Sequence, residues 1–538
     1  MNRTVATLLA AALLAARAPA QLDPPPEPPE NPVTAEKAVL GKILFWDEQL
    51  SSDNTVACGT CHRPAFGGSD PRPFRLAGPD GLLGTADDVF GSPGIVRSDE
   101  CNFFEPDPVH GFDPQVTGRS SQSFVMAAYD EDLFWDGRAS TTFLDPVSGA
   151  VSIAYGGGLE SQAAVPVLSG VEMGHAGRDW SEVTAKLATA RPLALADRLP
   201  PDVETALAAD PGYPDLFAAA FGDGAITAER IAWAIATYER TLVPDQTPWD
   251  RHFAGDSTAL TDAQKEGLRI FTFRAGCAAC HSPPLFADAG FHNIGLRDPA
   301  TDPGREAVTG DPADRGRFKT PSLRQLASRP RTMHTGQFDR IDDVVEFYDR
   351  GGDFSDNLDP LIAPLGLTAQ EKLDLADFLA HGLDDPRMLA ETAPFDRPRL
   401  HSEQKRGNPA VYGAGSAGSG GFVPAMLFGA PPNLGNVDFR FGLRDALAGA
   451  PALLVLSEAR DAADFGGIPV LVDFSRALGI LGWPLTGSGE GGGRATCAVA
   501  IPGDPALAGF VFVAQWFVID PQAAGGVAAS DGLECALF

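Results

Sequence analysis

The sequence predicts a mainly α-helical protein that ends in an all-β, sandwich-like domain. Three observations predict this fold class. The chain has 538 residues, which is too many for a single hydrophobic core and indicates several domains. Apolar residues recur at helical spacing up to about residue 400. From residue 422 onward, short runs rich in Val, Leu, Ile and Phe alternate with Gly and Pro turns.

The helical part contains four segments with clear starting signals. Helices are predicted to begin at Thr34, to span residues 227–242, and to begin at Thr261 and at Leu367. A threonine followed by acidic or amide residues and then by apolar periodicity is typical of a helix N-terminus. A further short helix is predicted to end at Gly351. Long loops should join these helices, because Gly and Pro together make up about a fifth of the chain.

The C-terminal part differs in composition from the rest of the chain. Residues 401–421 are rich in Gly and polar residues and are predicted to be a flexible linker. Residues 422–538 contain the β-prone runs and are predicted to form the sandwich-like module. Cys497 and Cys535 are the expected disulfide pair within it. The module shows no catalytic constellation.

The N-terminus has the features of a secretory signal. Residues 1–20 combine Arg3, an apolar run and a small-x-small cleavage site, and a Pro-rich segment follows at 21–33. No later stretch of about 18 apolar residues occurs, so no membrane span is expected. The protein is therefore expected in the periplasm or outside the cell.

The charge balance excludes some classes of partner. The chain has 71 acidic and 41 basic residues, which gives a formal net charge of −30. Nucleic acids and anionic membranes attract clustered Lys and Arg, so neither is an expected partner. A basic soluble protein would be attracted to this surface.

Two C-x-x-C-H motifs point to a specific cofactor. They lie 219 residues apart, which indicates one per domain. Two thiols at this spacing can add to the vinyl groups of a haem, and the adjacent His can bind its iron. A redox-active cysteine pair or a zinc site would not require the same His after both pairs. Two covalently bound haem c groups are therefore expected. The six residues are Cys58, Cys61, His62, Cys277, Cys280 and His281.

Further motifs follow in a recognisable order. They are Phe134-Trp-Asp-Gly-Arg138, Val171-Glu-Met-Gly174, Phe291-His-Asn293 and Phe318-Lys-Thr-Pro-Ser-Leu-Arg324. With the two haem motifs, this order resembles the bacterial dihaem cytochrome c peroxidase family, which includes the MauG branch. The resemblance covers about residues 34–395. It implies two cytochrome c-like haem domains, a peroxidatic one at 34–245 and an electron-transfer one at 246–400.

The resemblance also implies roles for individual residues. Glu172 would be the acid–base group for peroxide cleavage, with Gln162 as its hydrogen-bonding partner. Trp135 would relay electrons between the haems, and Arg138 and Lys319 would neutralise haem propionates. Each also has an ordinary interpretation, because a Glu in a loop, a core Trp and a surface cation are all common.

The sixth iron ligands are less uniform in the family, and alternatives stay open here. His110 is the candidate for the first haem, although MauG-type members leave that iron open. For the second haem the peroxidases have a Met fourteen residues beyond a His that corresponds to His334, and this position is Tyr348 here. Met333 is the alternative ligand. The family also places a calcium ion between the domains, but Ser120 replaces the usual Asn.

The sequence thus predicts a dihaem peroxidase that reduces hydrogen peroxide with electrons from a small donor such as a cytochrome c or cupredoxin. A MauG-like oxidase that acts on a protein or organic substrate through high-valent haems is the alternative. A non-catalytic electron-transfer cytochrome would give the Gln162 and Glu172 pair no purpose. A homodimer is compatible with the sequence.

Overall fold

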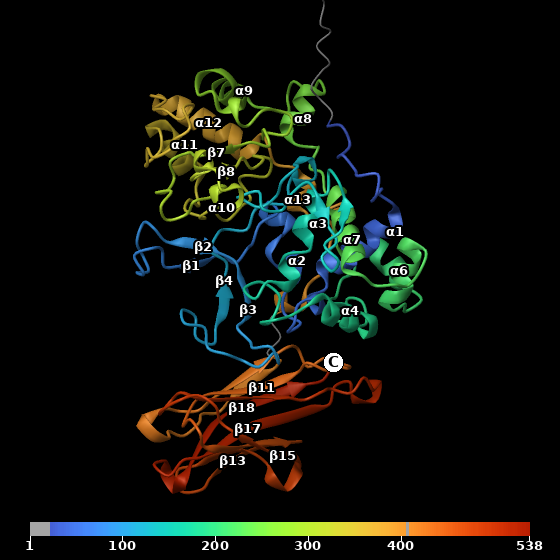
Figure 1. Cartoon of the computed structure of the whole chain (residues 1–538), viewed down its shortest axis with the longest axis vertical. Helices are drawn as coiled ribbons and strands as arrows, with labels where there is room; N and C mark the ends of the chain where they lie inside the picture. Colours follow the sequence, from blue (N-terminus) through green and yellow to red (C-terminus); the bar gives the residue numbers. More distant parts are fainter. Residues whose placement is uncertain (1–21, 405–407) are drawn as a thin grey trace, which may run out of the picture.

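The computed structural model describes residues 22–404 and 408–538. These residues form three parts that follow one another along the long axis (Figure 1). The part with the second C-x-x-C-H motif lies at one end, the part with the first motif lies in the middle, and the β-rich module lies at the other end. The predicted signal peptide, residues 1–20, lies outside the described residues.

Two long helices form the centre of the middle part. α1 (Ala35–Trp46) begins after Thr34, whose hydroxyl accepts a hydrogen bond from the Lys37 N–H. α7 (Ala228–Arg240) is capped in the same way by Thr227. Both predicted helices are confirmed. The helices touch at Gly41, where an added Cβ would lie 1.9 Å from the carbonyl oxygen of Ala234, so only glycine permits this approach.

The end part repeats this arrangement. α9 (Asp262–Arg269) begins after the predicted Thr261 cap. α12 (Ala369–His381) is also confirmed, and its cap is Thr368, one residue after the predicted start at Leu367. The two helices touch at Gly267, where a Cβ would lie 2.0 Å from the carbonyl oxygen of Asp374. The short helix α11 (Ile341–Arg350) is also confirmed and ends at Gly351 in the left-handed conformation.

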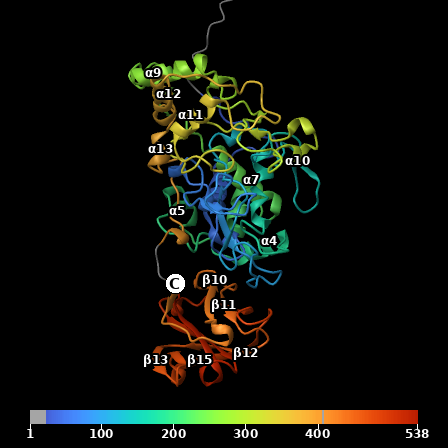
Figure 2. The same cartoon turned by 90° about the vertical axis from the view of Figure 1, so that its left-hand side faces the viewer.

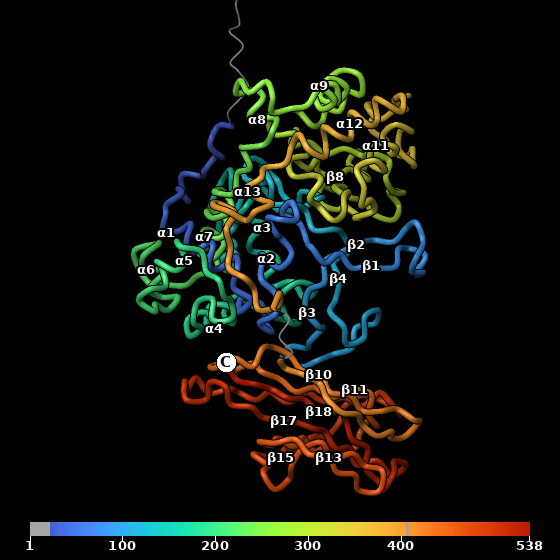
Figure 3. The backbone as a smooth tube through the Cα atoms, turned by 180° about the vertical axis from the view of Figure 1, so that it is seen from behind, coloured from blue at the N-terminus to red at the C-terminus, as the bar shows by residue number. Residues whose placement is uncertain are grey.

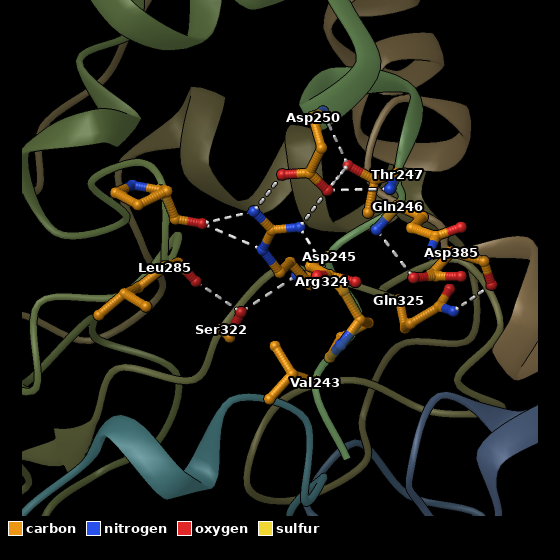
Figure 4. Close-up of polar contacts among 12 residues, drawn as sticks. Val243, Asp245, Gln246, Thr247, Asp250, Leu285, Ser322, Arg324, Gln325 and Asp385 are labelled. Carbon is orange, nitrogen blue, oxygen red and sulfur yellow. Dashed lines mark hydrogen bonds and ion pairs between the residues drawn. The ribbon is translucent and has the colours of Figure 1, made fainter. Parts of the chain in front are cut away.

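Arg324 joins the middle part to the end part (Figure 4). Its fully buried guanidinium forms a two-pronged ion pair with Asp250 of α8 (Pro248–Phe253), at 2.7 and 2.8 Å. It also donates to the carbonyl oxygens of Pro244 and Pro284, which precede α8 and follow the second haem motif. The contact with Pro244 therefore links the last residue of the Phe318–Arg324 motif to the end of the middle part.

The prediction of a mainly α protein is not confirmed, because helices account for only 28% of the chain. The haem-motif parts contain long loops, short strand pairs and many brief helices, since Gly- and Pro-rich segments limit helix length. The pairs include β3 (Pro93–Val96) with β4 (Pro114–Val116) and β7 (Phe291–His292) with β8 (Phe318–Lys319). The shorter helices include α2 (Cys58–Cys61), α3 (Gly158–Ala163), α4 (Trp180–Thr189), α5 (Pro201–Leu207) and α6 (Tyr213–Phe221).

The C-terminal module is β-rich, as predicted. Its larger antiparallel sheet has the order β15-β12-β17-β18-β9, and a second sheet has the order β10-β11-β16. The indole of Trp516 in the larger sheet is fully buried and donates to the carbonyl oxygen of Gly442 in the smaller one at 3.1 Å. The strands are β9 (Ala410–Tyr412), β10 (Ala425–Gly429), β11 (Arg440–Ala446), β12 (Pro451–Ser457), β15 (Ala477–Pro484), β16 (Gly493–Ala498), β17 (Val511–Ile519) and β18 (Val527–Ala536).

Two expectations for this module differ from the structure. Strand β9 lies within the predicted linker and pairs with β18. Cys497 and Cys535 are both buried but not bonded to each other. They lie on β16 and β18, which belong to different sheets.

Within the two described ranges, no helix is both long and apolar enough to cross a membrane.

Buried Glu48 attaches the segment that leads into the module. Its carboxylate accepts hydrogen bonds from the backbone N–H groups of His401 and Ser402, at 2.7 and 3.1 Å. Burial raises the pKa of Glu48 to about 7, because a charged carboxylate loses hydration there.

We expect this group to make stability depend on pH. The pKa is raised in the folded state, so the folded protein binds more protons than the unfolded chain between about pH 4.5 and 7. The free energy of unfolding should therefore fall as pH rises through this window. Glu48→Gln should make the fall smaller in denaturant titrations, whereas Glu36→Gln, at an exposed position of α1, should not. An unchanged slope in Glu48→Gln would contradict the assignment.

Candidate functional site

The first C-x-x-C-H motif borders a large cavity. This cavity has a volume of about 520 Å³, and Cys58, Cys61 and His62 line it. The motif forms the short helix α2, which packs against α1 at Gly59. A Cβ on Gly59 would lie 2.2 Å from the Trp46 ring, so a glycine between the cysteines allows the motif to lie against α1.

The second motif borders a separate cavity of about 190 Å³. Cys277, Cys280 and His281 line it, and α11 and α12 contribute apolar side chains to its wall. Each motif thus lies in a cavity of its own, as the wide spacing in the sequence predicts.

Both motif histidines are oriented for metal binding. Nδ1 of His62 lies 3.2 Å from the carbonyl oxygen of Gly68, and Nδ1 of His281 lies 3.1 Å from that of Phe286. A carbonyl oxygen only accepts, so Nδ1 bears the proton and Nε2 keeps its lone pair for iron. Burial lowers the pKa of both imidazoles, which favours the neutral form that binds metals. These residues fit a haem at each motif.

The zinc alternative fails on the arrangement of ligand atoms. Across the described ranges, one group of His, Cys, Asp and Glu has ligand atoms within 4.8 Å of each other: Cys280, Asp288 and His292. Both ring nitrogens of His292 already face carboxylates, Asp359 at 2.7 Å and Asp288 at 3.0 Å. Neither motif therefore forms the closed four-ligand cluster of a structural zinc site.

The wall of the first cavity includes both predicted catalytic residues. Gln162 comes from α3, and Glu172 from the turn that follows. The Ser169 carbonyl oxygen accepts hydrogen bonds from the N–H groups of Glu172, Met173 and Gly174, at 3.1, 3.0 and 2.8 Å. This turn fixes the backbone of Glu172 and leaves its side chain half-buried at the cavity.

Met173 and Arg178 fix the same turn from the protein side. The Met173 side chain is buried, and its carbonyl oxygen accepts a hydrogen bond from the Arg178 guanidinium at 3.2 Å. Arg178 also donates to the carbonyl oxygen of Val167 at 2.9 Å.

Trp135 borders both cavities. Its indole N–H donates to the carbonyl oxygen of Ser120 at 2.8 Å, and its own carbonyl oxygen accepts from the Lys319 N–H at 2.8 Å. These two hydrogen bonds fix the ring between the two cavities. On its second-cavity side, the ring centroid lies 6.2 Å from that of His334.

The two predicted counter-charges are already paired. Lys319 is buried, borders both cavities and forms an ion pair with Asp130. Arg138 borders the first cavity and pairs with Asp136 at 3.0 Å. Both charges therefore have protein partners at the place where propionates are expected.

Arg329 is a candidate that the sequence analysis did not assign to haem. It borders both cavities, and it forms no ion pair within the described residues. Its Nη2 donates to the carbonyl oxygens of Ser322 and Arg324, and its buried Nε has no hydrogen-bond partner. Its sequence position gives no sign of this, because the loop folds back between the cavities.

His110 does not lie among the residues that line the first cavity. Its backbone N–H donates to the Asp107 carboxylate at 3.0 Å, and its ring contacts Phe74 with centroids 6.3 Å apart. The carboxylate fixes a tight turn that directs His110 elsewhere. The structure therefore does not bring His110 to the first motif.

The candidate sixth ligands Tyr348 and Met333 line the second cavity, and so does His334. Tyr348 comes from α11, and burial raises the pKa of its phenol, so a bound metal would have to displace the proton. Met333 has a φ of 70°, an unusual conformation for this residue type. His334 stacks on Phe318 with ring centroids 3.6 Å apart, and its buried Nε2 has no hydrogen-bond partner.

The expected place for calcium contains a cation of the protein itself. Ser120 and Arg331 line a small pocket of about 10 Å³, and the Arg331 guanidinium lies 3.8 Å from the centroid of the Phe90 ring. The Ser120 carbonyl oxygen already accepts the Trp135 indole N–H. Asp70 also lines this pocket, and Arg331 pairs with Asp339 at 3.6 Å, so charges of both signs lie here.

Comparisons with known proteins agree with this site. A family model described as di-haem cytochrome c peroxidase matches residues 35–258. Cytochrome-c peroxidase IdrP1 of Pseudomonas sp. is 31% identical over 70% of this chain and 91% of its own length. Methylamine utilization protein MauG of Methylorubrum extorquens is 32% identical over 70% of this chain and 84% of its own length. A solved MauG-like protein associated with microbial copper homeostasis is 26% identical, covers 70% of this chain and 96% of its own, and has a TM-score of 0.51.

We expect two covalent haems per chain. A pyridine haemochrome assay on the denatured, acid–acetone-extracted protein should give two haems in the wild type and one in the Cys277→Ala, Cys280→Ala double variant, because each cavity has its own pair of thiols. One haem per wild-type chain would contradict the assignment of two cofactor cavities.

Proposed function

Because the chain belongs to the family of dihaem cytochrome c peroxidases and MauG proteins, which are oxidoreductases, we propose that it reduces hydrogen peroxide to water. One peroxide, two electrons and two protons give two waters. The observation that supports this proposal best is the first cavity, where Glu172 and Gln162 line the same space as the first C-x-x-C-H motif. A cytochrome that only transfers electrons needs no acid–base group at its iron.

Glu172 is proposed to move the proton that O–O cleavage requires. Its carboxylate can take a proton from one peroxide oxygen and give it to the other, which then leaves as water. The Gln162 amide can hold the peroxide by hydrogen bonds, since it both donates and accepts. A haem bound at His62 would supply electrons to the O–O bond. The hydrogen-bonded turn at Ser169 keeps Glu172 in place for repeated cycles.

Trp135 is proposed to connect the two cofactors. Its π-system borders both cavities, and its hydrogen bonds to Ser120 and Lys319 hold it in one orientation. Electrons would enter at the second cavity from a small donor protein such as a cytochrome c or cupredoxin. The net charge of −30 favours a donor with a basic surface.

Tyr348 favours a second candidate function, oxidation of a protein or organic substrate as proposed for a MauG-like enzyme. The phenol lines the second cavity, where the sequence comparison with peroxidases expects a thioether. A phenolate ligand stabilises oxidised iron and would oppose a high-potential, electron-collecting haem.

We further propose that the protein is exported to the periplasm or the cell exterior. This rests on the secretory features of residues 1–20.

Replacing Glu172 should separate cofactor binding from turnover. Glu172→Gln keeps the size of the side chain but removes the titratable proton, so both haem spectra should persist while steady-state peroxide consumption falls by about 10² or more. Glu204→Gln, on the exposed face of α5, is the matched control and should turn over normally. Wild-type turnover in Glu172→Gln would return this residue to the class of ordinary loop carboxylates.

Replacing Tyr348 should reveal the ligand of the second haem. If the phenolate binds iron, Tyr348→Phe should raise the reduction potential of that haem in a redox titration, because the anionic ligand is lost. Met333→Leu is the paired variant and should leave the potential unchanged. The opposite pattern, with Met333→Leu altering the potential and Tyr348→Phe not, would assign the thioether and remove the support for the second candidate function.

A further inference from the structure

The C-terminal module lies outside the part of the chain that the family model matches, which ends at residue 258. We propose that this module is a built-in clamp that positions Glu172. It would act by holding residues 97–105, here called the clamped turn, which in turn contact the segment that contains Glu172. The inference rests on the proposed acid–base role of Glu172 and assigns the module a part in the same site.

The module holds the clamped turn mainly through Phe104. This ring is 7% exposed and lies on the smaller sheet at Gly429 of β10 and Gly442 of β11. A Cβ added to either glycine would lie 2.7 Å from the ring, so the two glycines form the space that it fills. The Phe104 N–H also donates to the Thr496 hydroxyl at 3.0 Å.

Polar contacts surround this apolar anchor. Arg440, which is 2% exposed, lies 5.7 Å from the Phe104 ring centroid and donates to the carbonyl oxygen of Asn102. Arg494 of β16 pairs with Glu105 at 2.8 Å. An apolar anchor with a buried cation and a peripheral ion pair is the composition of a specific interface rather than an accidental contact.

The clamped turn is itself rigid. Ser98 and Phe104 pair as in a small hairpin, and the Asp99 N–H donates to the carbonyl oxygen of Phe103 at 2.9 Å. The Asp99 carboxylate also accepts from the N–H groups of Cys101 and Phe103. Because these hydrogen bonds make the turn rigid, holding it at Phe104 also restricts the position of Ser98 at its other end.

The base of the turn touches the Glu172 segment directly. At Gly94 of β3, an added Cβ would lie 1.9 Å from the carbonyl oxygen of Val171 and 2.8 Å from Cα of Glu172. The carbonyl oxygen of Ser98 accepts a hydrogen bond from the Ala176 N–H at 3.0 Å. The clamped turn and its strand therefore contact the chain on both sides of Glu172.

A second path runs through Asn102. Its side-chain amide donates to the carbonyl oxygen of Ser52 at 3.0 Å, and the Ser52 N–H donates to the carbonyl oxygen of Met173 at 2.8 Å. Arg440 of the module, Asn102, Ser52 and Met173 thus form a continuous chain of hydrogen bonds that ends next to Glu172. Figures 2 and 3 show β10 and β11 on the side of the module that faces the haem-motif parts.

The test removes the anchor and measures position and turnover separately. In full-length holoprotein, Phe104→Ala should raise hydrogen exchange in residues 171–176 and lower kcat with peroxide by about tenfold, at unchanged haem content and unchanged KM for the electron donor. Phe104→Leu should keep both the exchange and kcat close to the wild-type values, because the leucine side chain fills most of the space at Gly429 and Gly442. Thr496→Val is a milder variant should Phe104→Ala not fold. Phe474→Ala, at an exposed phenylalanine of the module, is the control and should change neither.

A double-mutant cycle decides whether the effect passes through Glu172. If it does, Phe104→Ala should cause no further loss of kcat in the Glu172→Gln background. Three results for Phe104→Ala would each overturn the proposal. The first is wild-type hydrogen exchange in residues 171–176, and the second is raised exchange with wild-type kcat. The third is an equal loss of kcat in the wild-type and Glu172→Gln backgrounds. Wild-type turnover in Glu172→Gln alone would refute the acid–base role instead, and the exchange measurement would still show whether the module holds the segment.

Discussion

The hydrogen bond from the Trp135 indole to the carbonyl oxygen of Ser120 fixes the aromatic side chain that borders both cavities. Its backbone is fixed as well, because its carbonyl oxygen accepts from Lys319 at the start of the Phe318–Arg324 motif. Arg324, at the other end of that motif, pairs with buried Asp250 within the second haem-motif part and donates to the carbonyl oxygen of Pro244 at the end of the first. The orientation of the ring between the cavities and the attachment of the two parts thus depend on one short segment. The relay role proposed for Trp135 would need this rigidity, since electron transfer depends on a constant separation between cofactors.

Buried charge indicates what the cavities are built to hold. Lys319 and Arg138 have carboxylate partners, so their charges are compensated within the protein. Arg329 has none within the described residues, and burial lowers its pKa to about 10. Its charge interacts with that of Asp384, and a haem propionate at the place where the cavities meet would add a closer partner.

The parts of this protein that were predictable from sequence are those that local chemistry determines. The helix starts at Thr34 and Thr261 are local, because each threonine side chain accepts a hydrogen bond from the N–H group three residues later. Each C-x-x-C-H motif likewise places its own cysteines and histidine in one cavity. Features that depend on how distant segments meet were not predictable. The position of Arg329 depends on a loop that folds back between the cavities. Residues 410–412 form the strand β9 because they pair with β18 at the edge of the larger sheet. Cys497 and Cys535 were expected to form a disulfide, but they lie in different sheets and are not bonded to each other.

The position of Glu172 combines both kinds of information. The motif Val171–Gly174 supplies the carboxylate and a turn closed on Ser169, but a turn of this length has little stability of its own. Its outer side is covered by β3 at Gly94 and by the hydrogen bonds of Ser52 and Ser98, which come from segments before it in the chain. Those segments in turn contact the C-terminal module through Phe104. A catalytic carboxylate must lie within a few tenths of an ångström of its working position, so a module without catalytic groups can still contribute to the reaction by restricting where that carboxylate lies.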